Sequence, residues 1–306
     1  MDDFANDTYE LNHPEVEIWE DDIRNIHPVA LMDEFELQEF DLDLLAGCPP
    51  CQGFSTITTL NGKHVFSDER NDLVLQFLHF VEHFLPKSVM LENVPGIAND
   101  ERFIRVYRGL KKLGYHITWD VLNAADFGVP QRRKRLILVG SLYEPVEFAP
   151  IAKVHPTVRD AIGKLPPAGA SGDPAHDIGE QRSKHIQMLI ERIPKDGGSR
   201  SSLPVKYRLK CHRKTNGFKD IYGRMAWDSV APTITGGCFN PSKGRFLHPE
   251  QNRAITMREA ALLQGFPHSY KFSSVSNKSA LAQLIGNALP PPFIKAHAAK
   301  VRSAIL

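Results

Sequence analysis

Segments typical of strands and of helices alternate along the first half of the chain. Short apolar runs that predict buried strands cover residues 43–47, 88–91, 116–121 and 135–139. Apolar residues recur at helical spacing over residues 73–84, and residues 103–113 form a second helix-like segment that ends at Gly114. This alternation predicts an α/β fold with a mostly parallel sheet and helices on both faces. Ligands of such sheets bind beyond the carboxyl ends of the strands.

The pattern changes after about residue 150. Proline, glycine, serine and basic residues dominate residues 166–215, and a helix-like pattern returns only at residues 293–305. The chain has 306 residues, of which 42% are hydrophobic, so two modest cores can form. We predict one domain of residues 1–150 plus 277–306 and a second, loop-rich domain of residues 151–276.

The composition indicates the cellular location of the protein more clearly than its function. The net charge of +1 does not by itself indicate a nucleic-acid partner, although basic residues cluster at 132–135 and within 206–219. Four cysteines are too few for a disulfide scaffold. The acidic N-terminus does not resemble a signal peptide, and every apolar stretch is too short to span a bilayer. We therefore expect a cytoplasmic protein without membrane association.

A rigid loop with two cysteines follows the first predicted strand. Residues 47–55 read Gly-Cys-Pro-Pro-Cys-Gln-Gly-Phe-Ser, so two prolines precede Cys51. Three interpretations are open: two structural cysteines, a Cys-x-x-Cys redox or zinc pair, and a nucleophilic Cys51. Zinc would need two more ligands, and the candidates Cys211, His212 and Cys238 include no second close cysteine pair.

Two further polar groups adjoin predicted strands. Glu92 ends the strand that follows the Cys51 loop, and neighbouring parallel strands would place both residues at one rim of the sheet. A thiol beside a carboxyl suits attack on an electron-poor ring whose nitrogen must be protonated. The basic run from Gln131 to Arg135 could direct guanidinium groups at phosphate, a ring carbonyl or the thiol. Taken alone, each feature also fits a solvated surface.

The order of these three motifs resembles that of the cytosine-C5 DNA methyltransferases of bacteria and phages. The match continues at residues 231–235, 248–249, 253–267 and 283–291. Residues 253–267 look like the family's segment that organises target recognition, and residues 283–291 look like its last motif, which returns to the cofactor pocket. The resemblance covers essentially the whole chain. It implies a Rossmann-like methyltransferase sheet and a smaller loop-rich target-recognition domain.

The resemblance also implies a mechanism. Double-stranded DNA would be the substrate, with its cytosine flipped out of the stack. Cys51 would attack C6, Glu92 would contact N3, and Arg133 and Arg135 would position the base and the thiol. C5 would then take a methyl group from S-adenosylmethionine, without a metal.

By the same resemblance, six residues would contact the cofactor: Asp22, Ile23, Pro49, Asn71, Leu73 and Asn287. Five would contact DNA: Gln52, Ser55, Asn93, Gln131 and Arg258.

One family motif is missing from the sequence. Members normally open with a strand and a Phe-x-Gly-x-Gly-Gly turn around the cofactor, whereas residues 1–14 look like a later piece. We therefore expect an N-terminally truncated sheet. Three explanations of the missing motif are open: a start codon assigned too late, a truncated remnant, and a second polypeptide that supplies the missing strand. The functional expectation is a restriction–modification or phage-defence enzyme. The alternatives are an RNA cytosine methyltransferase, which the long segment after the basic run disfavours, and an inactive DNA-binding remnant or subunit.

Overall fold

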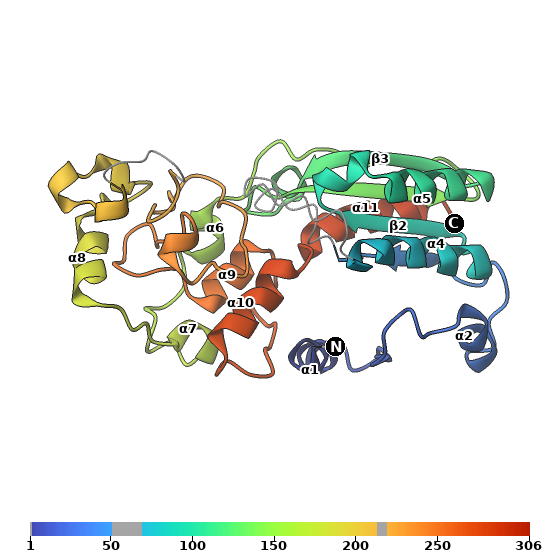
Figure 1. Ribbon diagram of the computed structural model, residues 1–306, viewed down its shortest axis with the longest axis horizontal. Coiled ribbons are helices and arrows are strands. Elements are labelled where there is room, and N and C mark those ends of the chain that lie inside the picture. Colours follow the sequence, from blue (N-terminus) through green and yellow to red (C-terminus); the bar gives the residue numbers. More distant parts are fainter. Residues whose placement is uncertain (1, 51–68, 213–218) are drawn as a thin grey trace.

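The computed structural model describes residues 2–50, 69–212 and 219–306 of the chain. The molecule has two lobes, one built on a β-sheet and the other on short helices and loops (Figure 1). The predicted site residues Cys51, Gln52 and Ser55 lie outside the described residues.

The sheet has four described strands. In spatial order they are β1 (Leu44–Gly47), β2 (Ser88–Asn93), β4 (Lys134–Ser141) and β3 (His116–Asn123). β1 and β2 are parallel, but β4 is antiparallel to both of its neighbours. The prediction of a mostly parallel sheet is therefore wrong for these strands. The connection from β3 to β4 contains only the 3₁₀ turn η4 (Ala124–Phe127), and without a crossover helix the two strands pair as an antiparallel hairpin.

Helices cover both faces of the sheet, as the sequence predicts. Because side chains alternate along a strand, Val89 and Leu91 of β2 face α4 (Leu73–Phe84) and α5 (Glu101–Lys112). Met90 of β2 faces the other side, where α11 (Pro291–Ser303) packs. The predicted α/β fold class is confirmed.

The second lobe is built around α9 (Met257–Leu263), in which every residue is buried. Its other helices are α6 (Val158–Ile162), α7 (Pro174–Asp177), α8 (Lys184–Arg192) and α10 (Lys278–Asn287). Leu281 and Ile285 of α10 belong to the same apolar cluster as α9. The predicted domain boundaries stay a prediction, and this packing favours placing α10 with the second lobe.

The N-terminal segment runs beneath both lobes (Figure 1). α1 (Asp3–Asn12) is attached to the second lobe, where the Asn12 Nδ2 atom donates to the Lys271 carbonyl at 2.8 Å. α2 (Pro28–Glu34) contacts α4 of the first lobe. β1 forms an edge of the described sheet, and its Leu44 is 36% exposed.

Short 3₁₀ helices complete the described elements: η2 (Glu69–Asp72), η3 (Pro95–Asn99), η4 as given above, η5 (Arg200–Ser202), η6 (Val205–Tyr207), η7 (Lys210–His212) and η8 (Pro241–Lys243). None of the described helices combines the length and hydrophobicity that a membrane crossing requires.

Candidate active site at the ends of strands β2 and β4

The residues just before Cys51 are held in place by the end of β2. Asn93 ends β2 and is buried, and its Nδ2 atom donates to the Pro49 carbonyl at 3.2 Å. The Asn93 Oδ1 atom accepts from the Val94 amide at 2.8 Å, which fixes the orientation of the side-chain amide. The residue two positions before Cys51 is thereby tied to the end of β2. Asn93 supports the loop in this way, while its predicted DNA contact stays a prediction.

Glu92 and Arg135 form an ion pair at the same edge. The Arg135 Nε atom lies 2.8 Å from Glu92 Oε1, and the two side chains are 16% and 14% exposed. The pairing follows from strand alternation, since Glu92 lies opposite Ile137 and Arg135 shares the face of Ile137. The Cys48 thiol, in the same loop as Cys51, also donates a hydrogen bond to the Glu92 carboxyl. Cys48 therefore lies beside Glu92, while the predicted meeting of Cys51 with Glu92 stays a prediction, since Cys51 lies outside the described residues.

Burial raises the pKa of Glu92 above its ordinary value, and this effect outweighs the lowering by Arg135 and Arg133. A carboxyl with a raised pKa holds a proton near neutral pH more readily than a solvated one. Glu92 can therefore act as a proton donor while Arg135 fixes its orientation.

Arg133 and Gln131 point away from solvent and connect the two lobes. The Arg133 Nη1 and Nη2 atoms donate to the carbonyls of Ile234 and Gly286 at 3.0 and 2.9 Å. The Gln131 Oε1 atom accepts from the Ile234 amide at 2.7 Å, and its Nε2 atom donates to the Leu263 carbonyl at 3.3 Å. Both side chains are buried. The contacts favour a positioning role, and the predicted contacts of Arg133 with the base and of Gln131 with DNA stay predictions.

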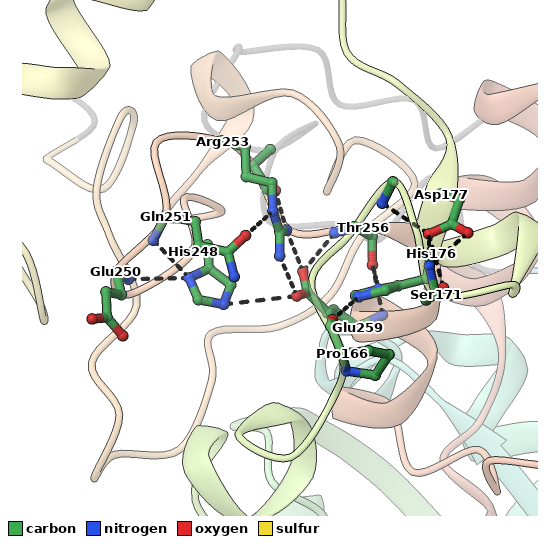
Figure 2. Close-up of polar contacts among 12 residues, drawn as sticks. Pro166, Ser171, His176, Asp177, His248, Glu250, Gln251, Arg253, Thr256 and Glu259 are labelled. Atoms are coloured by element: carbon green, nitrogen blue, oxygen red, sulfur yellow. Dashed lines mark hydrogen bonds and ion pairs between the residues drawn. The ribbon is translucent and has the colours of Figure 1, made fainter.

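A buried polar cluster, formed by His248, Arg253, Thr256 and Glu259, supports the start of α9 (Figure 2). Thr256 and Glu259 form a capping box, in which the Glu259 carboxylate accepts from the Thr256 amide at 2.7 Å. Arg253 donates two hydrogen bonds to Glu259, at 2.7 and 2.6 Å, and His248 Nε2 lies 3.7 Å from Glu259. Burial would raise the pKa of Glu259, but the Arg253 guanidinium holds it below its usual value. Burial lowers the pKa of His248 to about 4.

His176 extends the cluster toward α7. Its Nδ1 atom lies 2.8 Å from Thr256 Oγ1 and its Nε2 atom lies 2.9 Å from the Pro166 carbonyl, so both ring nitrogens are engaged (Figure 2). Sequence reasoning did not single out His176, because an isolated histidine in a loop-rich segment gives no pattern. Since these groups satisfy one another, the cluster organises the 253–267 motif.

Arg258 also takes part in packing. Its Nε atom is ion-paired with Asp173, its Nη1 atom donates to the Tyr270 carbonyl at 2.9 Å, and its guanidinium lies 5.4 Å from the centre of the Phe272 ring. The residue is 8% exposed. These contacts favour a structural role, and the predicted DNA contact stays a prediction.

The residues predicted to contact the cofactor are spread over several elements. Asp22 is half-buried, and both of its carboxylate oxygens accept hydrogen bonds from Arg24, at 2.9 and 2.6 Å. The side-chain hydrogen bond from Arg24 is the main reason that the pKa of Asp22 is lowered to about 2. Ile23 is 40% exposed, Asn287 is exposed, and Asn71 is buried beside the start of α4. The contacts of these residues with S-adenosylmethionine stay predictions.

The described residues among those considered for zinc do not form a site. Cys238 is fully buried in the apolar cluster around α9, and burial raises the pKa of its thiol to about 12. Within residues 2–50, 69–212 and 219–306, no group of three or more His, Cys, Asp or Glu side chains is arranged to hold a metal ion.

Comparisons with known proteins agree with the geometry. The model of the family described as "C-5 cytosine-specific DNA methylase" matches residues 1–303. The Type II methylase M.HgiDII of Herpetosiphon aurantiacus is 35% identical over 261 residues, covering 81% of this chain and 72% of that protein. The Type II methyltransferase M1.HphI of Haemophilus parahaemolyticus is 32% identical over 302 residues, covering 96% of this chain and 77% of that protein.

Solved structures share the fold. An E. coli prophage product described as a DNA modification methyltransferase superposes with a TM-score of 0.74 at 22% identity, over 99% of this chain and 90% of that chain. The Dnmt2 methyltransferase of S. pombe superposes with a TM-score of 0.59 at 21% identity, over 98% and 88% of the two chains. These findings do not support the second polypeptide that the sequence analysis considered.

Proposed function

The chain belongs to the family of C-5 cytosine-specific DNA methylases and is a DNA (cytosine-5)-methyltransferase, and on this premise we propose that it methylates a flipped cytosine in double-stranded DNA through a transient bond to Cys51. S-adenosylmethionine is the proposed methyl donor. Two of the relatives carry the names of Type II methylases. We therefore propose a role in a bacterial restriction–modification system, acting on DNA in the cytoplasm.

The observation that carries the proposal is the Glu92–Arg135 pair beside the Cys51 loop. Attack on C6 of cytosine places negative charge on the ring, and that charge must be neutralised at N3. A buried carboxyl whose pKa is raised can supply a proton there, and Arg135 holds the carboxyl in one orientation. A solvated surface carboxylate would offer neither property.

The proposed chemistry balances around the ring. The Cys51 thiolate forms a bond to C6 while Glu92 hydrogen-bonds to or protonates N3, so that C5 becomes nucleophilic. The bound cofactor supplies the methyl group that C5 accepts. Transfer of the C5 proton to a water molecule then expels the thiolate, and N3 returns any proton that it received to Glu92, which restores the aromatic ring.

A trapping assay tests the proposal. Long duplex DNA made with 5-fluorocytosine contains every short target site, and fluorine at C5 blocks the final elimination. We expect a covalent protein–DNA adduct from the wild-type chain with S-adenosylmethionine, no adduct from Cys51→Ser, and an undiminished adduct from the matched control Cys211→Ser. Full methyl transfer by Cys51→Ser would refute the assignment of the nucleophile.

A second candidate function is a catalytically inactive DNA-binding protein. The observation that favours it is the Asp22 carboxylate, which is occupied by Arg24 at the place where a cofactor contact was predicted. Salt-sensitive binding of duplex without adduct or methyl transfer would identify this function. Methylation of RNA in preference to duplex DNA would instead identify the RNA-directed alternative.

A further inference from the structure

A cavity of about 550 Å³ lies where the two lobes meet. From the sheet lobe it is lined by Arg132, which precedes β4. From the second lobe its polar lining includes Arg224, Asp228 and Arg245. A cavity of this size admits a phosphate group together with its sugar.

The alternation of side chains separates Arg132 from its neighbours in the basic run. Arg133 donates to buried carbonyls and Arg135 pairs with Glu92, whereas Arg132 is exposed at the cavity. The Arg132 main chain is fixed on both sides, because its amide donates to the Ala231 carbonyl at 2.9 Å and its carbonyl accepts from Thr233 Oγ1 at 2.7 Å. Among the described residues, the Arg132 guanidinium has no carboxylate partner. It is therefore an anchored cation available for an external anion.

Arg224 also lines the cavity, but its guanidinium is directed into the second lobe and not at the cavity. Arg224 is fully buried, and its five N–H groups donate to neutral acceptors. These are the carbonyls of Ile190, Ile193, His248 and Gln251 and the Asn252 side-chain oxygen.

The acidic groups at the cavity are already paired. Asp228 accepts from Arg159 at 2.7 Å, and Asp220 accepts from the lining residue Arg245 at 3.0 Å. The positive charge of Arg132 thus remains without a described carboxylate partner, and it favours an anionic ligand.

We propose that this cavity is a subsite for one phosphodiester group of the DNA backbone and that Arg132 is the residue that contacts it. The inference rests on the proposed function, since it supplies a place for the DNA that the enzyme methylates. Arg132 lies three residues before Arg135, which contacts Glu92, so a phosphate held there is anchored beside the catalytic edge. The guanidinium plane matches a phosphate through two parallel hydrogen bonds, which a lysine cannot reproduce.

The test measures binding without the cofactor, from the fluorescence anisotropy of a labelled unmethylated duplex titrated at several salt concentrations. The variants are Arg132→Ala, Arg132→Lys and the matched control Arg108→Ala, which removes an exposed arginine of α5. Methyl transfer to long unmethylated DNA by the wild-type chain is measured in parallel.

We expect Arg132→Ala to weaken binding about tenfold, and the slope of log K against log salt to fall by about 0.9, the contribution of one phosphate contact. Arg132→Lys should keep the slope and recover only part of the affinity, and Arg108→Ala should match the wild type. An unchanged affinity and slope for Arg132→Ala, beside a wild-type chain that methylates DNA, would overturn this inference alone. Absent methyl transfer with the expected change in slope would refute only the proposed function, and a wild-type chain that binds no duplex at low salt would refute both.

Discussion

His297 offers a direct measurement of how burial controls charge in this protein. It lies in α11 among the rings of Phe127, Phe148 and Phe293, with ring centroids 4.6, 5.5 and 5.2 Å away. The residue is 1% exposed, and its Nδ1 atom accepts a long hydrogen bond from the Ala149 amide at 3.4 Å. Its Nε2 atom has no hydrogen-bond partner among the described residues. Burial lowers the pKa of His297 from 6.5 to about 4.

The sign and size of the pH effect follow from this shift. A histidine whose pKa is lower in the folded state binds its proton preferentially in the unfolded state, so protonation favours unfolding. The stability contributed by the neutral ring is present above pH 6.5 and is lost as the pH falls toward 4. With 1.36 kcal/mol per pKa unit, the full loss is about 3 kcal/mol, and between pH 7.5 and pH 5 it is about 2 kcal/mol.

His297→Phe removes the titrating group and keeps an aromatic ring in the cluster. We expect its free energy of unfolding at pH 7.5 to lie within about 1 kcal/mol of the wild type, because one long hydrogen bond is exchanged for an apolar contact. Between pH 7.5 and pH 5 the variant should lose about 2 kcal/mol less than the wild type, measured by urea denaturation at both pH values.

His268→Phe, at an exposed position, is the matched control and should follow the wild type. His248, whose pKa is also lowered to about 4, is present in all three proteins and cancels from the comparison. Parallel pH dependence of His297→Phe and the wild type would refute the reasoning.

Three further predictions concern the candidate site. Glu92→Gln keeps a hydrogen-bonding partner for Arg135 but no acidic proton, so methyl transfer should fall at least 100-fold while duplex binding in a gel-shift assay stays within about twofold. Arg133→Met leaves two buried carbonyls without their donors and should lower the free energy of unfolding by about 3 kcal/mol. An unchanged urea midpoint would contradict the role of Arg133 in joining the two lobes. Gly286→Ala places a Cβ atom 2.4 Å from the Thr235 carbonyl carbon, a backbone contact that cannot yield cheaply, so we expect a loss of 2 kcal/mol or more, and wild-type thermal stability would exclude the close packing.

The local elements were predictable because their signals are local. The apolar spacing over residues 73–84 gave the bounds of α4, which ends where Leu85 adopts a left-handed conformation before Pro86. The direction of β4 was not predictable from its own residues. Direction depends on the short connection from β3 and on the space left between β2 and β3, and hydrophobic periodicity carries neither.

The site was predictable to the extent that strand ends define it. The position of Glu92 follows from the end of β2, and the structure adds the pairing with Arg135 and the raised pKa. The targets of Arg133 could not be predicted, because Ile234 and Gly286 come from segments more than a hundred residues away. The role of Cys51 stays a prediction, since it lies outside the described residues.

Substitutions of the arginines at the start of β4 should differ in their effects. Side chains alternate there, so Arg132 meets the cavity, Arg133 joins the two lobes, and Arg135 adjusts the proton affinity of Glu92. Loss of the positive charge therefore has a different effect at each position: on DNA binding at Arg132, on stability at Arg133 and on chemistry at Arg135. Arg132 and Arg133 directly precede β4, and Arg135 lies within it. A phosphate held at Arg132 and a base beside Glu92 would therefore contact one continuous stretch of backbone, which couples DNA docking to base positioning.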